Sequence, residues 1–299
     1  MNKTKIIIAI FLFGSSLMIC QTNQNDFPVL NGTYLGQKLP GLIPEIFARG
    51  IISTDDMENN IFFADDGREI YIERTGTGKS IIYLYKLGES GWLDPVEVKF
   101  NDDGGYNQPT SNTHLGVLLT GRTILKENQP PQVEISIRKR EGENWGISKM
   151  LVQGLRGSIS NNGAVYATIL DFSKGFWGRI ARYIPQDEVY VGLEFLSEAV
   201  NDPRFSSDHS IVAPDESFLI FSSKRDNDSK GGLYISFRDE KGNWSQAQNL
   251  SAVLKTPQSG NEWLASFSSD GKYLFYNVSG DIYWVDAKII DQLRPTNKL

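Results

Sequence analysis

Hydrophobic and polar residues alternate in short segments that recur along most of the chain, and a polar turn introduces each segment. The clearest copies are FADDGREIYI from Phe63, APDESFLIFS from Ala213 and SSDGKYLFYN from Ser268. Weaker copies are SNNGAVYATI from Ser160 and NTHLGVLLT from Asn112. Alternation with a period of two predicts a half-buried β-strand after each turn. The pattern therefore predicts an all-β protein built from five repeats.

The spacing of the turns indicates which all-β architecture the repeats form. When Asp66 marks the aspartate position of the first turn, the equivalent positions are Leu115, Asn162, Asp215 and Asp270. The successive steps are then 49, 47, 53 and 55 residues. A period of about 50 residues is typical of a propeller blade with four strands. We therefore predict a β-propeller of five four-stranded blades over residues 39–299, with six blades as the alternative.

A further alternating strand follows in every repeat, and a polar turn then leads to an outer strand. These further strands are SIIYLYKL from Ser80, VEISIRKR from Val133, GRIARYI from Gly178, GLYISFRD from Gly232 and DIYWVDA from Asp281. Trp92, Trp145 or Trp244 opens the outer strand in three repeats. We expect these tryptophans to pack between neighbouring blades, and a role in stacking on a sugar is the alternative.

The last repeat ends after DIYWVDAKII without an outer strand of its own. An open strand edge is an aggregation hazard, so another segment must cover it. The segment PGLIPEIFARGIIST, from Pro40 to Thr54, has the character of an outer strand. We predict that it completes the final blade and closes the ring. Residues 21–38 would then be a tether, and residues 288–293 a short terminal helix.

The first twenty residues have the pattern of a signal peptide. Lys3 and Lys5 precede an apolar run over residues 6–13, which is too short to span a bilayer. The single cysteine, Cys20, follows in the context Leu17-Met18-Ile19-Cys20, which resembles a bacterial lipobox. This resemblance implies a lipid on Cys20 and a membrane-anchored lipoprotein in the periplasm or on the outer membrane. An ordinary cleaved signal peptide is the alternative, and both interpretations predict export.

The charge of the chain bears on its partners. The formal net charge is −6, the isoelectric point is about 5.1, and no run of Lys or Arg occurs after the signal peptide. Binding to nucleic acid needs clustered cations that displace counterions from phosphates. We therefore expect no nucleic-acid partner.

Several phrases resemble the TolB-like, WD-repeat-like propeller repeats of exported bacterial lipoproteins, especially those of Bacteroidetes. They are LPGLIPEIFARGIIST, FADDGREIYI, HSIVAPDESFLIFSSKRD, LYISFRDEKGNWSQAQNL, FSSDGKYLFYN and GDIYWVDAKIIDQLRP. The resemblance covers residues 38–296 and is strongest in the last two repeats, whereas SNTHLG and SNNGAV depart from the usual Pro-Asp-Gly turn. It implies a propeller fold and a cell-envelope location. Fold alone does not establish function.

Few residues offer catalytic chemistry. No cysteine follows Cys20, His114 and His209 are the only histidines, and no G-x-S-x-G motif accompanies them. The stretch DNDSKGG from Asp226 resembles part of a calcium loop, but Lys230 occupies a position that needs an oxygen ligand. We interpret this stretch as a solvated turn. We therefore predict no catalytic set, no metal site and no cofactor.

Propellers bind ligands where the innermost strands begin, and counting back from the turns locates these positions. Eight residues before the turn positions stand Glu58 and Glu262, in repeats that become neighbours on ring closure. Six residues before them stand Asn60, Arg156 and His209. Together these five residues would form a pocket for a small polar ligand or a cation. Structural hydrogen bonds between strand starts are the alternative.

Two functions remain open at this point. The first is a non-catalytic binding or scaffold protein of the cell envelope, with a protein, peptide or glycan as its partner. The second is a carbohydrate-active enzyme, a glycoside hydrolase or lyase, that acts at the channel mouth through Glu58, Glu262 and His209. Paired carboxylates can cleave a glycosidic bond when their separation suits the reaction.

Overall fold

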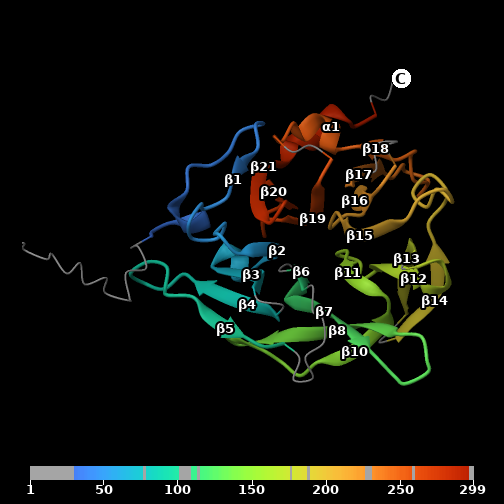
Figure 1. The fold of residues 1–299 in the computed structure, drawn as a ribbon, viewed down its shortest axis with the longest axis horizontal. Coiled ribbons are helices and arrows are strands. Elements are labelled where there is room, and N and C mark those ends of the chain that lie inside the picture. Colours follow the sequence, from blue (N-terminus) through green and yellow to red (C-terminus); the bar gives the residue numbers. More distant parts are fainter. Residues whose placement is uncertain are drawn as a thin grey trace, which may run out of the picture.

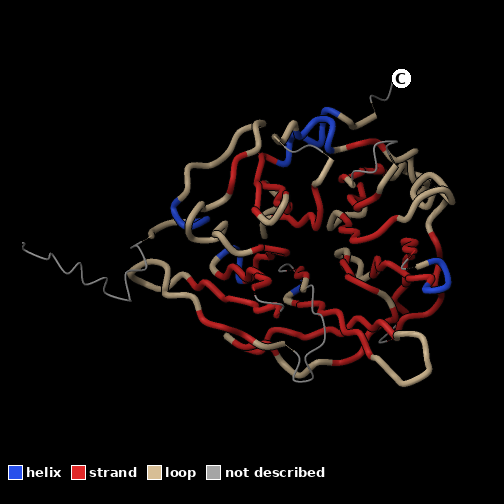
Figure 2. The backbone as a smooth tube through the Cα atoms, viewed as in Figure 1, coloured by secondary structure: helices blue, strands red, loops and turns tan. Residues whose placement is uncertain are grey.

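Five small antiparallel sheets stand around a common axis in the computed structural model of the chain (Figure 1). The tube in Figure 2 shows that strands make up most of the ring and that the helical segments are short. The structure describes residues 30–76, 79–100, 109–112, 115–175, 177–186, 189–225, 231–257 and 260–295. The predicted five-bladed β-propeller is confirmed.

Each blade is one sheet whose innermost strand contacts the innermost strands of its neighbours. Blade 1 comprises β2 (Met57–Ala64), β3 (Glu69–Gly76), β4 (Lys79–Lys86) and β5 (Val96–Val98). Blade 2 comprises β6 (Thr110–Asn112), β7 (Val117–Ile124), β8 (Gln132–Glu141) and β10 (Lys149–Gln153), with β9 (Asn144–Trp145) beside β8. Blade 3 comprises β11 (Leu155–Ile159), β12 (Val165–Asp171), β13 (Trp177–Gln186) and β14 (Val189–Phe195). Blade 4 comprises β15 (Ser207–Val212), β16 (Phe218–Ser223), β17 (Gly232–Phe237) and β18 (Gln248–Asn249).

Blade 5 joins the two ends of the propeller. It comprises β19 (Glu262–Phe267), β20 (Tyr273–Val278), β21 (Asp281–Asp286) and, from the N-terminal segment, β1 (Glu45–Ile46). β1 pairs antiparallel with β21, and the next residue, Phe47, donates its N–H to the carbonyl of Ile282 at 2.8 Å. The ring of Phe47 is buried 4.9 Å from that of Trp284, centroid to centroid. The predicted closure of the ring by residues 40–54 is therefore confirmed.

Part of the expected tether packs against the propeller instead. Thr33–Gly36 forms the 3-10 helix η1, and it buries Tyr34 and Leu35 in the hydrophobic core between blades 5 and 1. The indole Nε1–H of Trp92 donates to the carbonyl of Gly32 at 2.8 Å. Burial of two large side chains in this segment explains why it lies against the ring.

Two of the three outer-strand tryptophans, Trp145 and Trp244, lie between blades, as predicted. Trp145 of blade 2 donates its Nε1–H to the hydroxyl of Tyr71 in blade 1 at 3.0 Å. Trp244 of blade 4 packs edge-on against Tyr166 of blade 3, with ring centroids 6.0 Å apart. Each tryptophan thus adds apolar contact to a blade interface.

Buried carboxylates complete two of these interfaces. Glu69 of blade 1 accepts two hydrogen bonds from the guanidinium of Arg140 in blade 2, at 2.7 and 2.9 Å. Glu216, in the turn between β15 and β16, accepts from Arg182 of blade 3 at 3.1 and 3.2 Å and pairs with Arg238 of its own blade. Glu69 therefore links blade 1 to blade 2, and Glu216 links blade 4 to blade 3.

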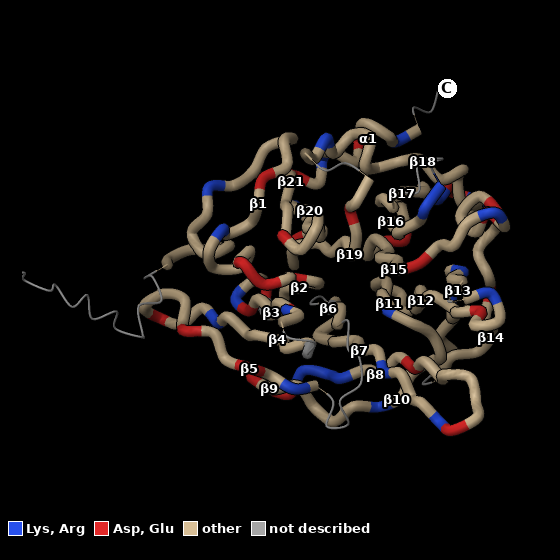
Figure 3. Tube along the Cα trace, in the orientation of Figure 1, with Lys and Arg blue, Asp and Glu red and all other residues tan. Residues whose placement is uncertain are grey.

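The remaining helices are short. They are η2 (Asp65–Gly67), η4 (Phe172–Lys174), α1 (Ser251–Leu254) and η5 (Ala287–Gln292). η5 corresponds to the terminal helix expected at residues 288–293. Within the described part of the chain, no helix has the length and apolar character needed to cross a membrane. Figure 3 shows both signs of charge distributed around the ring.

Candidate functional site

The innermost strands carry irregularities at matching positions, close to where the sequence placed the pocket. The pairing with the second strand shifts register at Arg156 in blade 3, at His209 in blade 4 and at Leu264 in blade 5. All three residues have left-handed backbone conformations, with φ of 41°, 50° and 54°. Such β-bulges re-aim a side chain out of the regular pleat. Three blades therefore present a re-aimed residue at the same level of the channel.

The side chain of Arg156 crosses the channel at this level. Its Nη2 donates to Oδ1 of Asn60 in blade 1 at 3.1 Å and to the carbonyl of Ala265 in blade 5 at 2.8 Å. Both blades lie two places away from blade 3 in the ring, so these bonds run across the axis. Asn60 in turn donates Nδ2–H to the carbonyl of Pro109, before blade 2, at 2.7 Å. Arg156 and Asn60 are both buried, so this network lies inside the molecule between the blades.

A buried carboxyl group lies near this guanidinium. Glu73 of β3 stands directly opposite Asn60 in the strand pairing and accepts a hydrogen bond from the hydroxyl of Ser80. Burial raises the pKa of Glu73, while the bond from Ser80 and the charge of Arg156 act in the opposite direction. Arg156 therefore favours the ionised form of a carboxyl group that burial disfavours.

Glu58, predicted in the same pocket, is held by groups near the ring closure. The hydroxyl and N–H of Thr54 donate to its carboxylate at 2.7 and 3.2 Å, and Nε of Arg74 donates at 3.1 Å. Arg74 also bonds the carbonyls of Ile51 and Ile52, in the segment that closes the ring. Burial raises the pKa of Glu58 despite these partners. The contacts of this carboxylate thus tie β2 to the closing segment.

Glu262 and His209 also bond close to their own positions in the chain. The buried carboxylate of Glu262 accepts from the hydroxyl of Thr256 and from the N–H of Gly260, the latter at 2.7 Å. Nδ1 of His209 lies 2.7 Å from Oδ1 of Asp208. The structure thus joins Asn60 and Arg156 of the five predicted residues by a hydrogen bond. The carboxylates of Glu58 and Glu262 bond to other groups. The ring of His209 packs edge-on against Trp263, the neighbour of Glu262 in the chain, with ring centroids 6.4 Å apart. Their role in binding a ligand stays a prediction.

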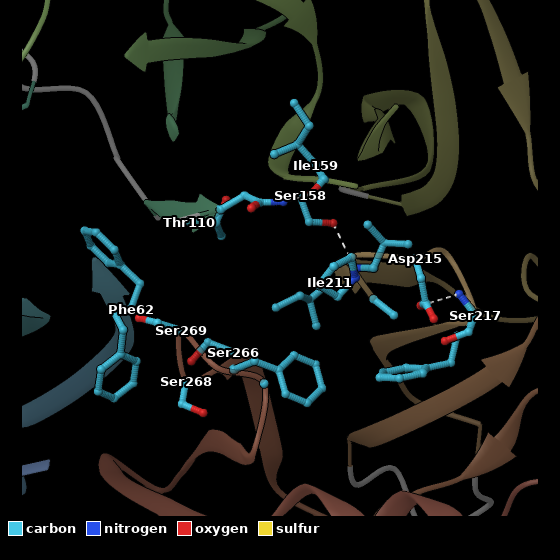
Figure 4. A pocket seen from close by; sticks show the side chains of 18 of the residues that line it. Phe62, Thr110, Ser158, Ile159, Ile211, Asp215, Ser217, Ser266, Ser268 and Ser269 are labelled. Carbon is cyan, nitrogen blue, oxygen red and sulfur yellow. Dashed lines mark hydrogen bonds between the residues drawn. The ribbon is translucent and has the colours of Figure 1, made fainter. Parts of the chain in front are cut away.

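A cavity of about 510 Å³ lies further along the same strands, where they end in the polar turns (Figure 4). Every blade contributes to its lining. Figure 4 shows Ser266, Ser268 and Ser269 near Phe62, with Thr110 and Ser158 across the cavity from them. The lining residues are Phe62, Phe63, Thr110, Asn112, Ser158, Ile159, Ile211, Val212, Ala213, Pro214, Asp215, Ser217, Phe218, Ser266, Phe267, Ser268, Ser269, Gly271 and Arg294.

This cavity was not predicted from the sequence, although counting back from the aspartate positions of the turns could have located it. Phe62, Ser158, Ile211 and Ser266 stand four residues before the aspartate positions of their turns, one step beyond the bulge level. Two residues along a strand span about 6.6 Å. The cavity therefore begins just beyond the layer in which Arg156 crosses the channel, and we call it the axial cavity.

Three predictions fall outside the described residues. These are the signal peptide over residues 1–20, the lipid attachment at Cys20 and the turn DNDSKGG from Asp226, which lies mostly in the gap between residues 225 and 231. Among the residues that the structure describes, His, Asp and Glu side chains form no group of three or more that could hold a metal ion.

Comparison with known proteins supports the architecture. No family model and no curated protein matches the sequence. The endo-arabinase from Bacteroides thetaiotaomicron has a similar structure, with a TM-score of 0.51 and 15% sequence identity over 82% of this chain and 96% of that chain. Weaker similarities include a mannose phosphorylase from Leishmania mexicana, with a TM-score of 0.48 and 12% identity over 83% and 88% of the two chains. They also include a gluconolactonase from Xanthomonas campestris, with a TM-score of 0.46 and 10% identity over 78% and 87%.

Sequence identities this low establish a shared fold and nothing finer. The five sheets, the N-terminal strand that completes blade 5 and the similarity to the endo-arabinase structure agree with one another. The chain is a five-bladed β-propeller in which Arg156 bonds to blades across the axis and all five blades line a cavity.

Proposed function

We propose that this chain is an exported, non-catalytic binding protein of the cell envelope, and that the axial cavity is its ligand site. The observation that carries this proposal is the convergence of all five blades on one cavity of about 510 Å³. Ligand pockets commonly have volumes of about 300–1,000 Å³ and combine apolar walls with a few polar groups. The lining, which mixes Phe and Ile with Ser, Thr and Asn, has this composition.

Catalysis on a carbohydrate is the second candidate. Some proteins of similar structure are named for sugar chemistry, among them the endo-arabinase and the mannose phosphorylase. For this chain such an activity would use Glu58 and Glu262 as the acid and the base or nucleophile. Both carboxylates are buried and accept hydrogen bonds from groups within six residues, so we place this function second.

The glutamine variants Glu58→Gln and Glu262→Gln separate the two functions. Under the binding function, we expect each variant to lose about 1–3 kcal/mol of stability, because a buried hydrogen-bond donor loses its acceptor. We expect neither variant to change the affinity for a ligand of the axial cavity. Turnover is measured on a panel of polysaccharides by reducing-end release, and affinity by calorimetric titration. Glycan cleavage that disappears in both folded variants would establish the enzyme instead.

The envelope location rests on the N-terminal sequence. We propose that Cys20 carries the lipid and that the propeller is held at a membrane in the periplasm or on the outer membrane. Replacing Cys20 by alanine should abolish incorporation of radiolabelled palmitate and move the protein from the membrane pellet to the soluble fraction. Equal labelling of the wild type and Cys20→Ala would contradict lipid attachment at this residue.

A further inference from the structure

The lining of the axial cavity offers two kinds of surface. Thr110, Ser158, Ser266 and Ser269 contribute hydroxyl groups from blades 2, 3 and 5. Ile211, Phe218 and Phe267, from blades 4 and 5, contribute half-buried apolar side chains. A ligand that fills this cavity must therefore offer both hydrogen-bonding groups and apolar surface.

Two hydroxyl groups of the lining point to a ligand. Thr110 donates its hydroxyl to the carbonyl of Gly157, and Ser158 accepts from the N–H of Val212. By contrast, the buried Oγ atoms of Ser266 and Ser269 have no hydrogen-bond partner among the described residues. Ser266 is only 4% exposed. Buried polar groups without a partner are uncommon in native proteins because they cost folding free energy. Hydroxyl groups of a ligand would supply the missing partners.

The apolar residues of the lining offer ring surface that the protein core does not cover. Phe218 and Phe267 meet edge to face, with ring centroids 5.8 Å apart. Ile211, Phe218 and Phe267 pack on the core of blades 4 and 5 from one side and line the cavity from the other. This arrangement favours contact with the C–H face of a flat or ring-shaped ligand.

The charged groups of the lining stand at the exposed rim of the cavity. They are one carboxylate, Asp215, and one guanidinium, Arg294, and both residues are exposed. Asp215 accepts the N–H of Ser217 at 3.0 Å, and Arg294 bonds to Asp291 at 3.3 Å. A single charge of each sign favours neither an anionic nor a cationic ligand. The hydroxyl groups and the apolar surface of the lining therefore determine which ligand the cavity binds.

We propose that the ligand of the axial cavity is a neutral saccharide unit of one or two sugar rings. This inference rests on the proposed binding function and adds the chemical class of the ligand. A pyranose ring carries hydroxyl groups around its edge and C–H groups on its faces. Its hydroxyl groups would bond to Ser266 and Ser269, and a C–H face would lie on Phe218 and Phe267. No charge of the ligand would then need compensation inside the cavity.

Calorimetric titration of the purified full chain tests the proposal, supported by saturation-transfer NMR on the ligand. The probes are methyl glucoside, maltose, cellobiose and mannobiose, with glucuronic acid and glucosamine as charged counterparts. We expect at least one neutral probe to bind. We also expect Ser266→Ala to weaken that binding about tenfold, the effect of one lost hydrogen bond.

Ser222→Ala is the matched control. Its Oγ is also buried without a partner among the described residues, but Ser222 does not line the cavity. We expect this variant to bind the neutral probe with unchanged affinity. Equal affinity of the wild type and Ser266→Ala would overturn the assignment of this hydroxyl group.

Two negative results have different meanings. If no saccharide binds but neutral aromatic or peptide fragments do, and Ile211→Ala weakens their binding, the saccharide assignment is wrong and the binding function stands. If no compound of any class binds in the cavity, both the saccharide assignment and the proposed function fail.

Discussion

Replacing Arg156 by methionine is expected to lower the free energy of unfolding by about 3–5 kcal/mol, the usual cost of removing one partner from a buried charged network. The guanidinium is fully buried and joins blade 3 to Asn60 of blade 1 and to the carbonyl of Ala265 in blade 5. Methionine fills similar space without donating a hydrogen bond, so both acceptors lose this donor. Urea unfolding followed by tryptophan fluorescence measures the loss.

The pH dependence of this loss identifies the role of Glu73. Burial raises the pKa of Glu73, and the charge of Arg156 opposes that rise. Without Arg156 the pKa of Glu73 rises further. A raised pKa in the folded state means that stability is present at low pH and is lost as the carboxyl group ionises. The deficit of Arg156→Met should therefore grow as the pH rises above the ordinary glutamate pKa of 4.5.

A second substitution and an exposed control complete this experiment. Adding Glu73→Gln to Arg156→Met should restore part of the stability and remove the pH-dependent part of the deficit. Arg49 is exposed, and Arg49→Met should change stability by less than about 0.5 kcal/mol. A wild-type unfolding curve for Arg156→Met would show that the guanidinium does not hold the channel together.

Replacing Glu216 by glutamine should destabilise the interface between blades 3 and 4 by about 3–5 kcal/mol. The carboxylate is 5% exposed and pairs with the guanidinium groups of Arg182 and Arg238. It also accepts the hydroxyl of Tyr166 at 3.1 Å. Glutamine keeps the shape but leaves two cations at the interface without a negative charge. Thermal unfolding by circular dichroism, at a fixed protein concentration, measures the change.

The same carboxylate should make stability sensitive to acid. Burial raises the pKa of Glu216, but the attraction of Arg182 and Arg238 outweighs it and leaves the pKa below the usual 4.5. A lowered pKa in the folded state means that stability is present above pH 4.5 and is lost as the pH falls through the folded-state pKa. Below pH 4.5 the unfolding midpoint of the wild type should fall more steeply than that of Glu216→Gln.

Glu194→Gln is the control for Glu216, because Glu194 is exposed on β14 in the same part of the ring. It should match the wild type at every pH. Identical acid profiles for the wild type and Glu216→Gln would assign the acid sensitivity to other carboxylates.

The architecture was predictable because it depends on local, repeated patterns. Period-two alternation after each turn marks strands that bury one face, and a step of about 50 residues matches four strands. The missing outer strand of the last repeat indicated a closing segment, and β1 supplies it in the structure. The tryptophans between blades followed from their repeated position at the start of outer strands.

The site was predictable only in part. Counting back from the turns identified Asn60, Arg156 and His209 as equivalent positions, and the register shifts confirm this equivalence for Arg156 and His209. Counting could not show that Arg156 crosses the axis, because its partners come from blades 1 and 5. Nor could it show that Arg74, which stands opposite Glu58 in the strand pairing, also bonds the carbonyls of Ile51 and Ile52, because those bonds depend on where the closing segment lies.

The sequence by itself determined the strands, their grouping into five blades and the segment that closes the ring, because burial of alternate residues and the need to cover strand edges act locally. Only the tertiary structure decided which charged groups pair across blades and where the axis is filled or hollow. Side chains from separate blades meet near the axis, where Arg156 bonds to blades 1 and 5 and residues of all five blades line the cavity beside Ser266. Their fit depends on three-dimensional distances that no spacing along the chain encodes.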